Sequence, residues 1–494
     1  MNCDIKNDKM IYESEYTDEI REEEEEEKHE EEEYIEIDPF PPDILNYANK
    51  IATLQDILMN IEPDNMVLIF LYLIENNYFE SESLISNFIS HILEVTDFRP
   101  AKIPLLCDFF SKLFFEIKGS PATIETIGNE LLRQLFLSIS NPYPFPNESS
   151  RPHFLYQLYK HQVIQIEKII EKLNDFISNY NWFVEPIAWV VCYFIDLVPS
   201  TIIKKATSRV KNDRYSNIVF RNFFNEKIFN NIERKNINKY VEVLKNDDVD
   251  GLYSLLSPSF NYDLTIPQCI FEECWFIQRE PTLICCAAYF GSIKCFKYLF
   301  LNGADLNKAD QESRTVAQFA VAGGNIEMVR LAEFVGCNFE GTIQIAAHFF
   351  QNEIFEWLYS TKFNDLSQEE KLLHHAAYSG NVRILVHCVL NGCDVNGGYH
   401  PQTPILKAAE NGKSDSVLIL LSHPKTDPNR PCNNETPLIY AARNGRDECV
   451  KILCSSEKVD VNWDGNDGNA LDYAIKYRQL DVVNVLNQFL DQNN

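Results

Sequence analysis

Histidine and cysteine side chains are the residues of this chain whose chemistry would be easiest to recognise. His374 and His375 are adjacent, and His387, Cys388 and Cys393 follow within one or two helical turns of each other, so a zinc site has to be considered. Protein zinc sites space their ligands in patterns such as Cys-x2–4-Cys and His-x3–5-His. Cys388 and Cys393 have a spacing of the first kind, but no two of these histidines have the second spacing, so the combined pattern is missing and we predict no metal site.

Other catalytic patterns are equally hard to find. His29-Glu30 lacks the second histidine of a zinc-protease motif. We find no glycine-rich phosphate loop, no G-x-S-x-G turn and no kinase signature. Aspartate and glutamate are too abundant for any pair to stand out as an acid and base. We therefore predict a non-enzymatic protein with no catalytic residue and no cofactor, and we keep an enzyme hidden within residues 39–236 as an alternative.

Charge is distributed unevenly along the 494 residues, whose net charge is −29. Residues 1–38 hold 18 Asp and Glu against 4 Lys and Arg, with unbroken runs at Glu22–Glu27 and Glu30–Glu33. Such runs repel themselves and bury little surface, so we predict a disordered acidic tail, with a single charged helix as the alternative. The tail would steer a basic partner, occupy a groove of the protein, or only improve solubility. So acidic a chain is not expected to bind nucleic acid.

Apolar stretches and cysteines indicate the cellular setting. The longest apolar stretches, Met66–Ile74 and Ile187–Ile195, are far shorter than the roughly 20 residues that cross a bilayer, so we expect no membrane span. The segment Met1–Asp4 has no signal-peptide character. Fourteen cysteines without a Cys-x-x-Cys pair are typical of reduced, buried thiols. We expect a cytoplasmic monomer, with the nucleus as a further possible location.

The sequence pattern is mostly helical, so helices are expected to position any functional site. Residues 39–236 show apolar stripes at helical spacing and capping residues such as Ser81 and Ser120-Pro121, which predict an α-helical domain. Residues 237–280 hold a short helix pair, around Tyr240–Leu244 and Gly251–Leu256, followed by a connection. We interpret this pair as an atypical N-terminal cap of the array that follows.

A repeated pattern fills residues 281–494. Its clearest copies are Thr403–Gly412 and Thr436–Gly445: a Thr-Pro start, two apolar residues, an Ala pair and a Gly. The positions equivalent to that Gly are 291, 324, 350, 380, 412, 445 and 478, with Phe350 and Arg478 replacing Gly. A period near 33 residues is typical of a stacked solenoid. In each copy the Thr is expected to cap a helix, the Ala pair to allow close packing, and the Gly to form the turn.

These residues resemble ankyrin repeats, about seven of them, and the start at Pro281–Phe296 is similar to a divergent ankyrin-type domain of unknown function found in large protist families. The resemblance implies an all-α solenoid, preceded here by the helical domain and the acidic tail. It also implies that His374 is a structural histidine rather than a ligand.

Ankyrin repeats bind proteins through hairpin tips and exposed positions near the end of the inner helix. The resemblance therefore implies a scaffold or adaptor that binds a protein partner on the concave face. The candidate partner-binding residues are Tyr289, Phe290, Arg314, Phe349, Tyr378, Glu410, Arg443, Asn444 and Tyr477. Packing against neighbouring repeats or the helical domain is the alternative for the aromatic members. A ubiquitin-ligase substrate adaptor is a second functional alternative, because Pro41–Leu45 is similar to the start of an F-box helix.

Overall fold

The computed structural model describes residues 39–493 apart from 118–119, 141–149, 180–184, 213–237, 258, 270–271, 273, 364–370 and 398–401. Within these ranges the regular structure is helical and no strand is formed, which confirms the all-α prediction. The predicted acidic tail, residues 1–38, lies outside the described residues.

The N-terminal helical region is built around one almost fully buried helix, α4 (Glu82–Phe98). Ser81 caps its start by accepting a hydrogen bond from the Leu84 amide at 3.2 Å. Helices α2, α5, α6 and α7 all pack against α4. The other helices of this region are α2 (Pro42–Met59), α3 (Met66–Glu75), α5 (Ile103–Glu116), α6 (Pro121–Ser140), α7 (Ser150–Lys160), α8 (Ile166–Asn179), α9 (Glu185–Tyr193) and α10 (Ser200–Asn212), with a short 3-10 turn η1 (Pro100–Lys102).

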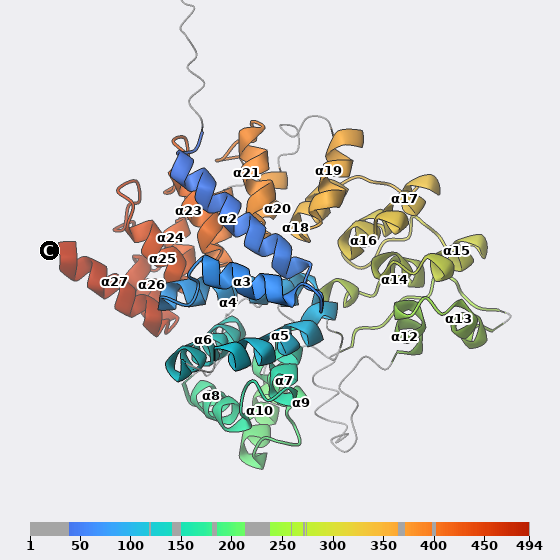
Figure 1. Ribbon diagram of the computed structural model, residues 1–494, viewed down its shortest axis with the longest axis horizontal. Helices are drawn as coiled ribbons and strands as arrows, with labels where there is room; N and C mark the ends of the chain where they lie inside the picture. Colours follow the sequence, from blue (N-terminus) through green and yellow to red (C-terminus); the bar gives the residue numbers. More distant parts are fainter. Residues whose placement is uncertain are drawn as a thin grey trace, which may run out of the picture.

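The C-terminal half is a stack of helix pairs, each with an inner and an outer helix (Figure 1). Each inner helix packs against the inner helix of the next pair. A shorter pair, α12 (Lys239–Lys245) and α13 (Val249–Leu255), and the 3-10 turn η3 (Trp275–Ile277) precede the stack. The seven pairs are α14 (Leu283–Phe290) with α15 (Ile293–Leu301), α16 (Val316–Gly323) with α17 (Ile326–Phe334), α18 (Thr342–His348) with α19 (Asn352–Thr361), α20 (Leu372–Ser379) with α21 (Val382–Leu390), α22 (Pro404–Glu410) with α23 (Ser414–Ser422), α24 (Pro437–Arg443) with α25 (Asp447–Cys454), and α26 (Ala470–Lys476) with α27 (Leu480–Asn493).

Local sequence explains each inner helix. The hydroxyl of Thr403 accepts a hydrogen bond from the Leu406 amide at 3.3 Å, and that of Thr436 accepts one from the Ile439 amide at 3.4 Å. A proline follows each Thr at the first helical position, where its missing N–H leaves no bond unmade. The Ala pairs that follow are fully buried between neighbouring inner helices, because only a small side chain fits there.

The turn after each inner helix adopts one backbone conformation in all seven pairs. The five glycines, at positions 291, 324, 380, 412 and 445, have φ between 68° and 85°. Phe350 and Arg478 occupy the same turn with φ of 54° and 57°. For residues with a Cβ this left-handed conformation costs about 1–2 kcal/mol. The turn geometry is therefore imposed by the stack, and the helical region supplies part of the compensation at Phe350.

The helical region lies along the edge of the stack that carries these turns. Figure 1 shows α2 crossing the array, and α2 packs against the outer helices α21 and α23. At the third pair, Arg99 from the end of α4 donates a hydrogen bond to the carbonyl of Phe350 at 3.3 Å, and the Phe98 ring lies 5.3 Å from the Phe350 ring. The two halves of the chain thus share one continuous core.

Candidate functional site

The chain covers part of its own concave face, the face lined by the inner helices. The segment Cys274–Gln278, which includes η3, lies against α14, α16 and α18 through aromatic side chains. The Phe276 ring is 4.7 Å from that of Phe319 and 4.9 Å from that of Phe349. The Trp275 ring stacks on Phe349 at 5.6 Å with an interplanar angle of 17°. We call this segment the internal plug.

Arg314 helps to fix the internal plug. Its guanidinium donates a hydrogen bond to the carbonyl of Phe276 at 2.9 Å and lies 4.0 Å from the centre of the Phe276 ring. Its Nε donates to Asp310 at 2.6 Å. Arginine combines ring stacking with directed hydrogen bonds in this way more readily than lysine does. The plug is therefore bound by polar as well as apolar contacts.

Three of the nine predicted partner-binding residues are buried by these and similar contacts. Phe349 lies beneath Trp275, and Arg314 is engaged by the plug. Asn444 donates a hydrogen bond to the carbonyl of Glu410 at 3.1 Å between neighbouring repeats. These three side chains hold the molecule together in this conformation, so we do not carry them into the proposal for partner binding. Tyr289 and Phe290, at the end of α14, are half-buried, and the Tyr289 ring lies 6.2 Å from that of Phe276.

The remaining predicted residues lie at or after the ends of α20, α22, α24 and α26, beyond the internal plug. These four residues, Tyr378, Glu410, Arg443 and Tyr477, are all partly exposed. Tyr378 stacks on His348 at 5.1 Å, and Tyr477 stacks on Tyr473 at 6.3 Å. Arg443 pairs with Glu435 at 2.8 Å, and Glu410 pairs with Lys407 at 2.9 Å. We call Tyr378, Glu410, Arg443 and Tyr477 the open concave residues.

A hollow of about 370 Å³ opens at the start of this open part. His374 and His375 both line it, together with His348, Tyr378, Gln402 and Lys407. Burial lowers the pKa of both His374 and His375 to about 4, so their rings are neutral at neutral pH. Among the described residues, no three His, Cys, Asp or Glu side chains are grouped so that they could hold a metal ion.

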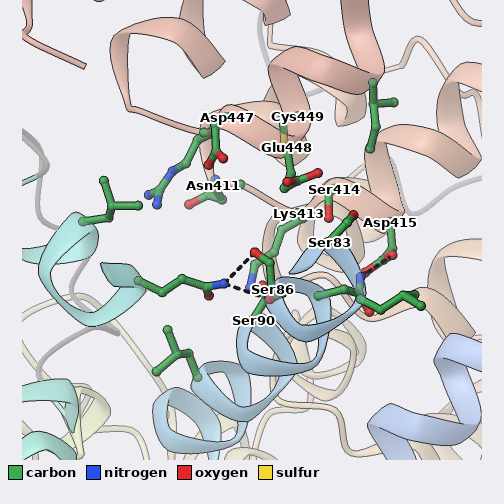
Figure 2. Close-up of a pocket in the computed structure, with 18 of the residues that line it drawn as sticks. Ser83, Ser86, Ser90, Asn411, Lys413, Ser414, Asp415, Asp447, Glu448 and Cys449 are labelled. Carbon is green, nitrogen blue, oxygen red and sulfur yellow. Dashed lines mark hydrogen bonds between the residues drawn. The ribbon is translucent and has the colours of Figure 1, made fainter. Parts of the chain in front are cut away.

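A second set of residues, which sequence reasoning missed, lies at the seam between the helical region and the array. A cleft of about 250 Å³ separates α4 and α6 from the turns before α23 and α25. Figure 2 shows Ser83, Ser86 and Ser90 on the α4 side, facing 411–415 and 447–449 of the array. The cationic groups Lys413 and Arg133 at this cleft are already paired with carboxylates, Lys413 with Glu94 at 2.9 Å and Arg133 with Glu130 at 2.7 Å.

Buried polar contacts hold the seam closed. The Gln55 amide donates a hydrogen bond to the carbonyl of Gly380 at 2.7 Å, and the Val382 amide donates to the Gln55 side chain at 3.1 Å. Farther along, Arg133 lies 3.4 Å from both Asp447 and Asp481. These contacts join the helical region to the fourth, sixth and seventh repeats, so the array is supported over most of its length.

Four ionisable groups form the centre of the seam, and we call them the seam cluster. His91 Nδ1 lies 2.9 Å from Glu94, and His91 Nε2 lies 3.2 Å from Asp415. Lys413 completes the set through Glu94, and Asn87 donates to Asp415 at 2.9 Å. Two cations and two anions balance one another in a place where an unpaired charge would be costly. The paired charges therefore have a structural role: they join α4 of the helical region to the fifth repeat of the array.

Burial and pairing act in opposite directions on the pKa values of the seam cluster. Burial alone would lower the pKa of His91, but Glu94 and Asp415 outweigh burial and raise it to about 10. Burial would raise the pKa of Glu94, but Lys413 and His91 lower it. Burial would likewise raise the pKa of Asp415, which His91 lowers instead. His91, Glu94 and Asp415 are therefore all charged at neutral pH.

The seam cluster predicts a stability maximum in mildly acidic solution. The raised pKa of His91 gives stability that is complete below its ordinary value of 6.5 and is lost as pH rises toward about 10. The lowered pKa values of Glu94 and Asp415 give stability that is lost as pH falls below their ordinary values of 4.5 and 3.8. We expect the free energy of unfolding, measured by urea denaturation, to fall by up to about 1.4 kcal/mol per pH unit above 6.5.

The His91→Gln variant is the matched comparison for this prediction. It removes the titrating group, so its stability should change less steeply with pH between 6.5 and 10 than that of the unmodified protein. Equal slopes for the two proteins would contradict the assignment of the alkaline loss to His91.

Comparison with known families agrees with the geometry of the array. The family model "Ankyrin repeats (3 copies)" matches residues 343–432 and 408–493, and the model "Ankyrin repeats (many copies)" matches residues 284–332. A search of curated proteins found no match. No helix among the described residues is long and apolar enough to cross a bilayer. Ankyrin repeats indicate a protein–protein interaction domain and are typically non-catalytic. The C-terminal half of this chain accordingly consists of ankyrin repeats.

Proposed function

We propose that this protein is a non-enzymatic scaffold whose ankyrin array binds a protein partner through the open concave residues. The observation that supports the proposal most strongly is that the two ends of the concave face differ in exposure. The internal plug fills the face at the first three repeats, whereas Tyr378, Glu410, Arg443 and Tyr477 remain partly exposed at the last four. Tyrosine and arginine are enriched at the energetic centres of protein interfaces.

The contacts between the helical region and the turns of the array support the same proposal. A solenoid bends and twists through small changes between neighbouring repeats. Here the helical region contacts the turn edge at Phe350, Gly380, Lys413 and Asp481. A preorganised surface loses less entropy when it binds. We therefore assign the helical region the role of holding the concave face in a fixed curvature for its partner.

A triple substitution tests the proposed surface. We expect the Tyr378→Ala, Arg443→Ala, Tyr477→Ala variant to bind its natural partner at least about 100-fold more weakly, because each residue of an interface centre contributes more than about 1 kcal/mol. The partner is first identified by affinity purification with mass spectrometry, and the dissociation constant is then measured with the purified pair.

The matched control replaces three large, exposed residues of the outer helices and their ends, Leu301, Phe334 and Leu390, with Ala. This control should bind the partner as the unmodified protein does. If the concave triple variant, still folded by circular dichroism, binds equally well, the concave face is not the partner site.

A further inference from the structure

A series of aromatic rings runs along the concave face from the internal plug into the hollow. Each ring contacts the next in a stacked, tilted or edge-on arrangement, and the series crosses from α16 to α18 and α20. The centroid separations are 4.7 Å for Phe319–Phe276, 4.9 Å for Phe276–Phe349, 5.6 Å for Phe349–Trp275, 5.9 Å for Trp275–His348 and 5.1 Å for His348–Tyr378. The plug thus shows how this face takes aromatic side chains from a short segment of chain that forms a single 3-10 turn.

The series ends where the hollow begins, and His348 stands at that boundary. Its side chain is only 7% exposed and lines the hollow, yet neither ring nitrogen has a hydrogen-bond partner among the described residues. A buried polar atom without a partner is destabilising, because it has lost its hydrogen bonds to water. Buried polar groups in native proteins are usually satisfied, so an unsatisfied one next to a cavity indicates that something else supplies the bond.

Charge distinguishes between classes of ligand. Burial holds the pKa of His348 well below its ordinary value, so the ring is neutral and offers one donor and one acceptor. Two lysines line the hollow. Lys407 is already paired with Glu410, and Lys371, exposed at the start of α20, has an interaction of its own. The hollow therefore favours a ligand with an aromatic face and a hydrogen-bonding tip over an anion. Tyr and Trp side chains have both features.

We infer that the hollow receives the side chain of a Tyr or Trp from a short segment of the protein partner, stacked on Tyr378 and hydrogen-bonded to His348. The partner's segment continues the path that Trp275 and Phe276 take over the preceding repeats. This inference rests on the proposed function and names the chemistry by which the open concave surface recognises its partner.

The test uses N-acetyl-tryptophanamide as the probe and the full-length protein with ¹³C-labelled histidine. NMR titration should shift the ring signals of His348, His374 and His375 and leave that of His423 unchanged. N-acetyl-leucinamide and N-acetyl-glutamate amide serve as apolar and acidic comparisons. Shifts of equal size with the leucine probe, larger shifts with the glutamate probe, or no shift with the tryptophan probe would each overturn the inference.

Variants locate the probe within the face. Tyr378→Ala should weaken binding of N-acetyl-tryptophanamide about two- to ten-fold, the range that a lost aromatic pair accounts for. Phe334→Ala, at the exposed end of the outer helix α17, should leave the affinity unchanged, and equal affinities of all three proteins would overturn the inference. If the tryptophan probe fails while the concave triple variant still loses its partner, the scaffold proposal stands and only the ligand chemistry is wrong.

Discussion

Replacing Glu94 with Ala should lower the free energy of unfolding by about 3–5 kcal/mol, the usual cost of removing one partner from a buried ion pair. Glu94 is 3% exposed and lies between His91 and Lys413. Without its carboxylate, His91 keeps only Asp415, Lys413 loses its ion-pair partner, and the Gln55 amide loses a hydrogen bond of 3.2 Å. We also expect α21 and α23 to exchange their amide hydrogens faster, because the contact between α2 and these helices would weaken.

Chemical denaturation followed by circular dichroism measures this loss, and the control is Glu171→Ala. Glu171 is an exposed glutamate in the middle of α8, so its replacement should change stability by less than about 0.5 kcal/mol. A Glu94→Ala variant within 1 kcal/mol of the unmodified protein would show that the seam cluster contributes little to holding the two halves together.

Replacing Gly323 with Ala should destabilise the array by at least about 3 kcal/mol. A Cβ at this position would lie 1.9 Å from the carbonyl oxygen of Tyr289 in the neighbouring inner helix. No side-chain rotation relieves the contact, because the obstructing atom belongs to the backbone. The helices α14 and α16 would have to separate, and overpacking of this kind costs about 1–3 kcal/mol even where side chains can adjust. Thermal unfolding should show the loss directly.

Gly128 provides the matched control for this prediction. It lies in the middle of α6, and a Cβ there would meet nothing within 4 Å. Gly128→Ala should therefore raise stability by about 0.5–1 kcal/mol, since Ala restricts the unfolded chain and favours the helix. If Gly323→Ala were as well tolerated as Gly128→Ala, the close approach of α14 and α16 would be wrong.

The array could be predicted from sequence because its determinants are local and recur. Thr403, Ala408 and Gly412 each specify one feature of a repeat, and the same types return after about 33 residues. The left-handed turn extends even to Phe350 and Arg478, where the residue type no longer indicates it. In those two copies the period located the turn, and the neighbouring repeats impose its conformation.

The seam and the internal plug could not be predicted in the same way. Gln55 and Gly380 are 325 residues apart, and neither belongs to a motif that would suggest the pairing. His91 and Glu94 are three residues apart on one helix, which identifies a helical face but not its partner. Trp275 and Phe276 lie outside the repeat period, so nothing in the pattern places them on the concave face. Such contacts depend on tertiary packing rather than on local sequence.

The docked helical region also restricts how this protein can change over evolutionary time. Free solenoids gain and lose whole units readily, since each unit contacts only its neighbours. Here the helical region contacts the stack at Phe350, Gly380, Lys413 and Asp481. Duplication or deletion of a unit between the first and last of these contacts would move every later contact out of register. The number of units within that span should therefore be fixed by descent.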